Sequence, residues 1–137
     1  MKRFAPKLLE KRSRIQARPD DSAPNDDKRP PKFCLEFLSK DFCISACTKN
    51  EKAAFADRLR EMSSLTWEQL RHAPRDKQGY EQIAHSAIRA GLPKHITEDT
   101  KLLAFRCFGK APMVGYRDKS VFHIIWFDRE FKLYKHS

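Results

Sequence analysis

The chain has 137 residues, enough for one domain with a modest apolar core, and its ten Phe, two Trp and three Tyr supply large side chains for that core. No apolar run approaches the ~20 residues that a membrane-spanning helix needs, and none follows the basic N-terminal residues, so we expect neither a membrane partner nor a secretory signal. The formal net charge of +10 favours a polyanionic partner, although solubility alone is the simpler explanation.

Residues 1–32 are predicted to form a basic, Pro-rich arm, flexible or ordered by a partner, that precedes a single domain over residues 33–137. The arm contains five prolines and ten basic against five acidic residues. Few large apolar side chains follow Ile15, so this segment cannot bury enough surface to offset the entropy of ordering it. A short basic helix between Pro6 and Arg18, formed on contact with nucleic acid or protein, is the alternative to a solvated tail.

The domain is predicted to begin with a strand over residues 32–38, where Phe33, Leu35 and Phe37 alternate. Helices should follow. Capping-box spacing predicts one over residues 49–62, opened by Thr48 and Glu51, and a second, shorter one over 64–70, where Thr66 and Gln69 repeat that spacing. A third helix is expected over residues 80–90, ending at Gly91.

The remaining chain is predicted to form consecutive antiparallel strands, because β-branched and aromatic residues recur in short runs broken by Gly, Pro and Asp. These runs cover residues 101–108, 111–117, 121–127 and 131–136. The run 121–127 is apolar on both faces, so it should lie inside the sheet, with His123 on the same side as Val121, Ile125 and Phe127. The fold class is therefore α+β: about three helices packed on a C-terminal sheet of three to four strands, plus the N-terminal strand.

Four residues of the predicted sheet are candidates for phosphate chemistry: Arg106, Arg117, Tyr134 and His136. An arginine presents a planar, always charged guanidinium that suits a phosphate. Tyr134 and His136 alternate on one face of the last predicted strand, so both can reach the same cleft as an acid and a base. Each of these residues taken alone is better explained structurally, as a surface arginine, a packed tyrosine or a terminal histidine. His123 is expected to be a buried core residue.

The charge distribution extends this site to nearby lysines. Residues 33–100 are neutral, whereas residues 101–137 hold eight basic against three acidic residues. The candidate RNA-binding lysines are Lys101, Lys110, Lys119, Lys132 and Lys135. Polyanion contacts are thus expected on the strands and the arm, not on the helices.

No metal or other cofactor is expected. Cys43 and Cys47, with Cys34 nearby, lack the closer knuckle spacing and matched second pair of structural zinc sites. With only four glycines, a phosphate-cradling loop is disfavoured. Without an export signal, the four cysteines are expected to be reduced thiols of a cytoplasmic protein.

Several of these features together resemble the RelE/YoeB superfamily of toxin endoribonucleases, over about residues 49–136. They are helices followed by antiparallel strands, Arg106 on the first strand, Gly115-Tyr116-Arg117 in the second, and Tyr134-x-His136 near the C-terminus. The resemblance implies cleavage of messenger RNA, commonly in the ribosomal A site, and neutralisation by a small antitoxin. Arg106 and Arg117 would then be phosphate-binding cations, and Tyr134 and His136 the acid and base. The Pro-rich arm, the N-terminal strand and the long insert before the sheet depart from this pattern.

Two functions follow as hypotheses. In the first, the chain is a metal-independent endoribonuclease that works by 2′-hydroxyl attack, with RNA, the ribosome and a small acidic antitoxin as partners. In the second, it is a non-catalytic adaptor or inhibitor that binds nucleic acid or protein. The segment around Val121–Phe127 also resembles uncharacterised proteins of phages and mobile elements, which suits either hypothesis.

Overall fold

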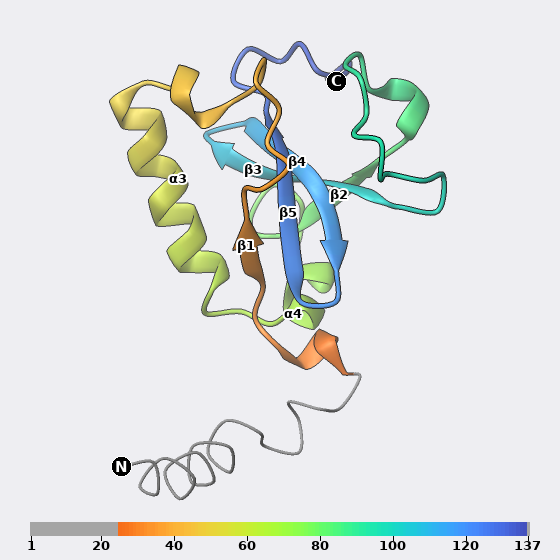
Figure 1. The fold of residues 1–137 in the computed structure, drawn as a ribbon. Coiled ribbons are helices and arrows are strands. Elements are labelled where there is room, and N and C mark those ends of the chain that lie inside the picture. The colour runs from red at the N-terminus through yellow and green to blue at the C-terminus, as the bar shows by residue number, and fades with distance from the viewer. Residues whose placement is uncertain (1–24, 137) are drawn as a thin grey trace, which may run out of the picture.

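The computed structural model describes residues 25–136, so most of the predicted arm (residues 1–24) and Ser137 lie outside the described residues. The described part is an α+β domain with a five-stranded sheet and two α-helices (Figure 1), so the α+β class is confirmed, whereas the expected number of helices, about three, is not. None of its helices combines the length and the apolar character that crossing a bilayer requires. The elements are β1 (Lys32–Cys34), α3 (Lys49–Met62), α4 (Trp67–His72), β2 (Tyr80–Ile83), β3 (Leu102–Phe108), β4 (Ala111–Asp118) and β5 (Val121–Phe127).

The sheet has the strand order β1-β5-β4-β3-β2. Strands β3, β4 and β5 form the predicted antiparallel meander, with β4 at the centre. The N-terminal strand is shorter than predicted and pairs parallel to β5, from Lys32 opposite Val121 to Cys34 opposite His123. The sheet is therefore mixed, and its two edges are formed by the two shortest strands.

The predicted third helix over residues 80–90 is wrong. Residues 80–83 form β2, which pairs antiparallel with β3 from Tyr80 opposite Phe105 to Ile83 opposite Leu102. A single 3₁₀ turn follows at His85–Ala87. Apolar residues in so short a run fit the periodicity of a helix or of a strand. Residues 80–83 form a strand here because the backbone groups at the edge of β3 need hydrogen-bond partners.

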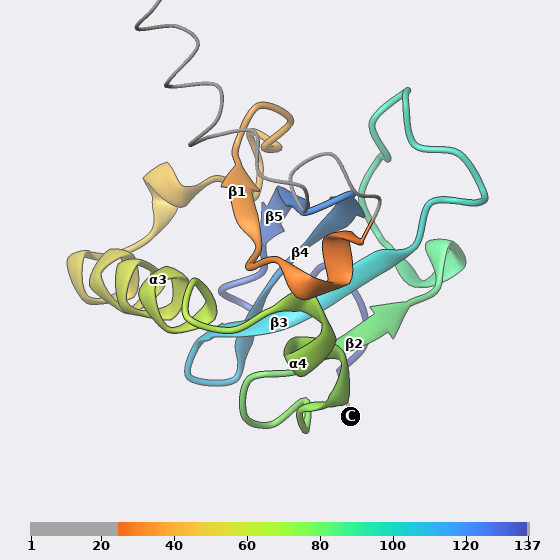
Figure 2. The same ribbon diagram turned by 90° about the horizontal axis from the view of Figure 1, so that it is seen from below.

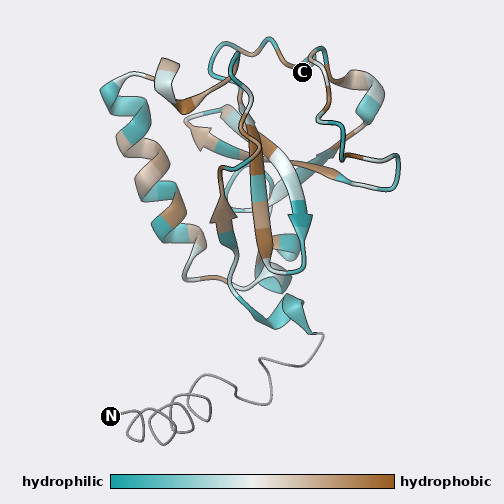
Figure 3. Cartoon of the chain, in the orientation of Figure 1, coloured by the Kyte–Doolittle hydropathy of each residue, from teal (hydrophilic) through white to brown (hydrophobic). Residues whose placement is uncertain are grey.

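Large side chains bury both faces of the sheet. Trp67 of α4 packs against Phe105 and Phe122 on one face, with ring centroids 6.2 and 6.3 Å away. On the opposite face, Trp126 of β5 is fully buried in a cluster with Leu133 of the C-terminal segment, and Ile88 and Ile96 of the connection between β2 and β3 pack against that cluster. Figure 2 shows the helices and this connection on opposite sides of the sheet, and Figure 3 shows hydrophobic residues concentrated along the strands.

A β-bulge corrects the predicted facing of β5. The register between β4 and β5 shifts between Val114 and Gly115, which leaves Ile125 as an extra residue in β5. Phe127 consequently packs on the helix side of the sheet, whereas His123 stacks on a tyrosine ring of the opposite face. The two were predicted to share one side, and the bulge separates them.

Both predicted capping boxes are confirmed, and the first offers a test of local stability. Thr48 Oγ1 accepts a hydrogen bond from Glu51 N at 3.1 Å, while Glu51 Oε1 accepts one from Thr48 N at 2.8 Å. Thr48→Ala should lower the free energy of unfolding by about 1 kcal/mol, because an N-terminal amide of α3 loses its partner. Thr97→Ala, in an exposed loop, should change it by less than about 0.5 kcal/mol. Urea denaturation measures both, and equal effects would contradict the capping role.

Candidate functional site

The residues after β5 form a turn around one buried carboxylate. Asp128 is fully buried and accepts hydrogen bonds from the backbone N–H of Lys132 at 2.7 Å and of Leu133 at 3.1 Å. These bonds satisfy amides that a strand would have paired with a neighbour. The predicted last strand over residues 131–136 is therefore wrong, and the chain instead turns back over the sheet.

The same carboxylate holds His136. The distance between His136 Nε2 and Asp128 Oδ2 is 2.9 Å. An ionised carboxylate only accepts hydrogen bonds, so this contact requires a proton on Nε2, and the tautomer that satisfies it has its lone pair on Nδ1. The ring of Tyr134 stacks on that of His136 with centroids 4.0 Å apart. Tyr134 and His136 thus lie together because of the C-terminal turn, and not because they alternate along a strand.

The protonation of Tyr134 narrows its possible role. Burial, with smaller contributions from Glu81 and Asp128, raises the pKa of the Tyr134 hydroxyl to about 12. The hydroxyl therefore stays protonated at neutral pH and can donate a hydrogen bond or a proton. Of the acid and base roles expected from the sequence, Tyr134 suits the acid and His136 the base.

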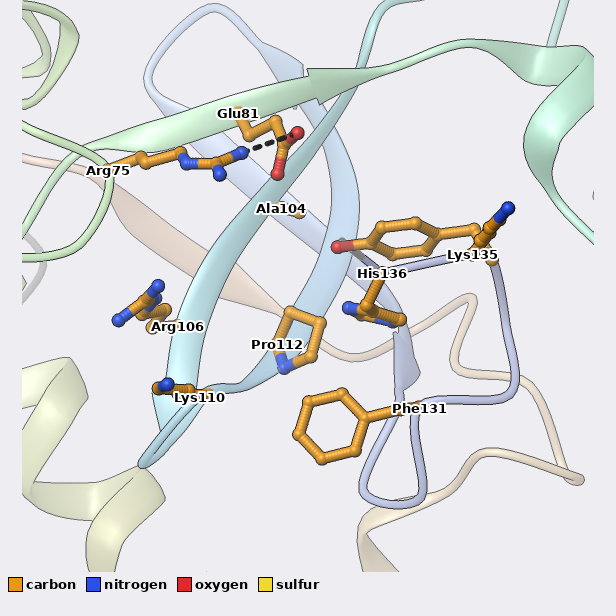
Figure 4. Close-up of a pocket in the computed structure, with 10 residues that line it drawn as sticks. Arg75, Glu81, Ala104, Arg106, Lys110, Pro112, Phe131, Lys135 and His136 are labelled. Atoms are coloured by element: carbon orange, nitrogen blue, oxygen red, sulfur yellow. Dashed lines mark ion pairs between the residues drawn. The ribbon is translucent and has the colours of Figure 1, made fainter.

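Tyr134 and His136 line a cavity of about 130 Å³ between the C-terminal turn and strands β2, β3 and β4. Its one carboxylate, Glu81, is paired with Arg75 at 2.7 Å. In Figure 4, Arg106 and Lys110 lie on one side of the cavity and His136 and Phe131 on the other, with Pro112 between them. The cavity is strongly positive, since four of its lining side chains are cations: Arg75, Arg106, Lys110 and Lys135.

Strand lengths explain why Arg106 reaches this cavity. The last residue of β3 that pairs with β2 is Phe105, so Arg106 follows at the point where the edge of β3 becomes free of β2. Arg106 and Pro112 are partners across the β3–β4 hairpin, and Lys110 lies in its turn. The hairpin end and the C-terminal turn thus form two walls of one site.

The structure does not bring Arg117 into this site. Arg117 lies five residues beyond Pro112, or about 17 Å along β4, and its guanidinium sits 4.5 Å from the ring centroid of Trp67 on the helix-covered face. Its Nη2 pairs with Asp27 Oδ1 at 2.8 Å, and Arg71 Nη1 pairs with Asp27 Oδ2 at 2.7 Å. Hydrogen bonds from Arg71 and then Arg117 lower the pKa of the Asp27 carboxyl. Three of the four candidates, Arg106, Tyr134 and His136, therefore line one cavity, and Arg117 lies apart from it.

The five predicted lysines divide in the same way. Lys110 and Lys135 line the cavity. Lys101 lies at the opposite end of β3, and Lys119 lies in the turn between β4 and β5. Lys132 belongs to the C-terminal turn but lines a separate hollow. The positive charge of the sheet is thus spread over both ends, with only part of it at the cavity.

Sequence reasoning missed three residues of the site: Arg75, Asp128 and Phe131. The sequence carries a signal for Asp128, since a carboxylate eight positions before a histidine can reach it after a turn. Phe131 is 44% exposed and adopts a positive φ of 59°, and its ring meets His136 edge-on with centroids 4.9 Å apart. An exposed aromatic side chain held in this uncommon backbone region suits a stacking role.

Within residues 25–136, no three His, Cys, Asp or Glu side chains gather closely enough to hold a metal ion. All four cysteines are free thiols, and burial raises the pKa of Cys107 to about 12, which keeps that thiol protonated. Searches of protein-family models, curated proteins and solved structures find no match to this chain. The geometry of the cavity is therefore the basis for assigning a function.

Proposed function

We propose that the chain is an endoribonuclease of the RelE-like kind, which cleaves messenger RNA in the cavity between Arg106 and His136. The observation that supports this most strongly is the hydrogen-bonded pair of His136 and the buried Asp128 at the wall of a strongly positive cavity. Such a pair orients an imidazole as a general base, and the cations attract a phosphodiester.

The proposed reaction uses the 2′-hydroxyl of the substrate as the nucleophile. His136 Nδ1 takes the 2′-hydroxyl proton, the 2′-oxygen bonds to phosphorus, and the bond from phosphorus to the 5′-oxygen breaks. The Tyr134 hydroxyl gives its proton to the leaving 5′-oxygen, so the products are a 2′,3′-cyclic phosphate and a 5′-hydroxyl. Arg106 and Lys110 stabilise the charge that builds on the phosphoryl oxygens. This route requires no metal, because the substrate supplies the nucleophile and side chains supply the positive charge.

A cleavage assay tests the proposal directly. The full chain is incubated with an RNA oligonucleotide and with DNA of the same sequence in the presence of EDTA, and separately with messenger RNA on ribosomes in magnesium buffer. We expect cleavage of RNA alone, with cyclic-phosphate ends, and a greater rate on ribosomes if the resemblance to RelE/YoeB toxins extends to the substrate. Intact RNA under all conditions, or equal cleavage of DNA, would contradict the proposal.

Arg106→Gln should lower the rate of RNA cleavage by on the order of 10²-fold, because the transition state loses a charged donor. Arg71→Gln removes the same charge from α4, on the other face of the sheet, and should leave the rate unchanged. Initial rates at saturating RNA measure the effect. Arg117→Gln separates the site inferred here from the one expected from sequence: a loss as large as that of Arg106→Gln would place the site elsewhere.

A second candidate function is RNA binding without cleavage, as an adaptor or inhibitor. It is favoured by the other contacts of Asp128, which bind backbone amides and close the C-terminal turn, so that a purely structural pair would look the same. An adaptor of this kind would bind RNA with an affinity that falls steeply with salt, because phosphate contacts release counterions. Steep salt dependence with no product would support this second function.

A further inference from the structure

A second, larger cavity of about 470 Å³ adjoins the first. Arg106 and Lys110 line both cavities, so these two side chains form their common border. The other walls of the second cavity come from α3 and from the loop at residues 76–78 before β2. Residues far apart in the sequence thus form one continuous hollow around the end of the β3–β4 hairpin.

A buried arginine of α3 holds this cavity in shape. Arg58 is only 6% exposed, and its Nε donates a hydrogen bond to the carbonyl oxygen of Arg106 at 2.8 Å. Its Nη2 donates to the carbonyl oxygen of Gln78 at 3.2 Å. One side chain therefore fixes both the hairpin and the loop that carries Lys77, so the cavity is preformed.

The charge of the cavity favours an anion. Four cations line it against two carboxylates. Within the described residues, Arg58 Nη1 is buried without a hydrogen-bond partner, and Oε1 of the half-exposed Glu61 side chain lies 3.7 Å from it. The positive charge of Arg58 is consequently only partly balanced inside the protein. This charge acts on the cavity across a short distance. No ion pair of Lys77 or Lys110 is found among residues 25–136, so both side chains can contact a ligand in the cavity that they line.

We propose that this second cavity binds the phosphate of the RNA nucleotide next to the cleaved one, with Lys77 and Lys110 as its contacts. The proposal rests on the RNA-cleaving function proposed above and adds a second subsite to it. The bound RNA would be single-stranded, with its backbone crossing Arg106 and Lys110 from one cavity to the other. Stacking of an RNA base on the exposed ring of Phe131 also requires single-stranded RNA, because the bases of a duplex are already stacked on one another.

Binding of RNA that cannot be cleaved tests this subsite separately from catalysis. Fluorescence anisotropy is measured with fully 2′-O-methylated oligonucleotides, a dinucleotide and a hexanucleotide, which lack the attacking hydroxyl. The hexanucleotide should bind at least ten-fold more tightly. Lys77→Gln should weaken hexanucleotide binding about five- to ten-fold and leave dinucleotide binding unchanged. The salt dependence of hexanucleotide affinity should also fall by about one phosphate contact, a slope change of roughly 0.7.

Lys94→Gln is the matched control, because it removes the same charge from an exposed lysine in the connection between β2 and β3. It should leave the affinity for both oligonucleotides unchanged. Equal affinity for both lengths, equal losses for Lys77→Gln and Lys94→Gln, or equal binding of a duplex would overturn the second subsite. None of these results depends on turnover, so cleavage of RNA in the presence of any of them would keep the proposed function and reject this inference alone.

Discussion

His136→Ala is expected to lower the rate of RNA cleavage by about 10²- to 10⁴-fold, the range usually lost with a general base. The substitution removes the only lone pair that the buried Asp128 orients toward bound substrate in the proposed mechanism. Asp128 keeps its hydrogen bonds to the amides of Lys132 and Leu133, so the C-terminal turn should persist. Single-turnover cleavage of a labelled RNA oligonucleotide measures the effect.

Two further variants separate catalysis from folding. His72→Ala changes an exposed histidine at the end of α4 and should leave the rate unchanged. Asp128→Asn preserves the shape and an accepting oxygen but removes the charge that positions His136, so it should lower kcat and leave KM nearly unaltered. A His136→Ala protein that unfolds at the same urea concentration as the wild type and still cleaves RNA at the wild-type rate would contradict the role of His136 as the general base.

Gly115→Ala should destabilise the fold by about 3 kcal/mol, at the upper end of what overpacking usually costs. A Cβ atom on Gly115 would lie 1.9 Å from the carbonyl oxygen of His123 and 3.0 Å from the Cα of Ile124. Both contacts are with the backbone of β5, so no side-chain rotation relieves them. Relief would require the bulge at Ile125 to open, which breaks the pairing of the central strand β4 with β5.

Gly91→Ala is the control for this substitution, because a Cβ there meets no atom within 4 Å and the backbone has no positive φ. It should leave stability unchanged or raise it by less than about 1 kcal/mol through the unfolded state. Urea denaturation followed by tryptophan fluorescence compares the two. Equal stability of both variants would show that the close approach at Gly115 is relieved at little cost.

Much of the fold is predictable from local chemistry in the sequence. Thr48 and Thr66 start their helices through capping boxes, and the apolar runs after residue 101 form the meander. What the sequence does not reveal is pairing over long distances. β1 gains its partner from the far end of the chain, and residues 80–83 become a strand only because β3 has an open edge.

The candidate site was also predictable only in part, because it too depends on how distant parts of the chain pair. Arg106, Tyr134 and His136 do line one cavity, whereas Arg117 lies at the other end of its strand, bound to Asp27. Residue type identifies a candidate, but register and face decide whether it joins the others. The bulge at Ile125 is a further example, since a single extra residue exchanges the faces of everything beyond it.

The parallel pairing of β1 with β5 has a consequence for synthesis of the protein. Lys32 leaves the ribosome well before its partner Val121, which lies far along the chain. Until then, the segment before α3 has no sheet to join, while α3, α4 and the β2–β3 pair can already form in the nascent polypeptide. The early segment thus stays undocked until β5 has been made, and until then it is open to chaperones or to any protein that captures unfinished chains.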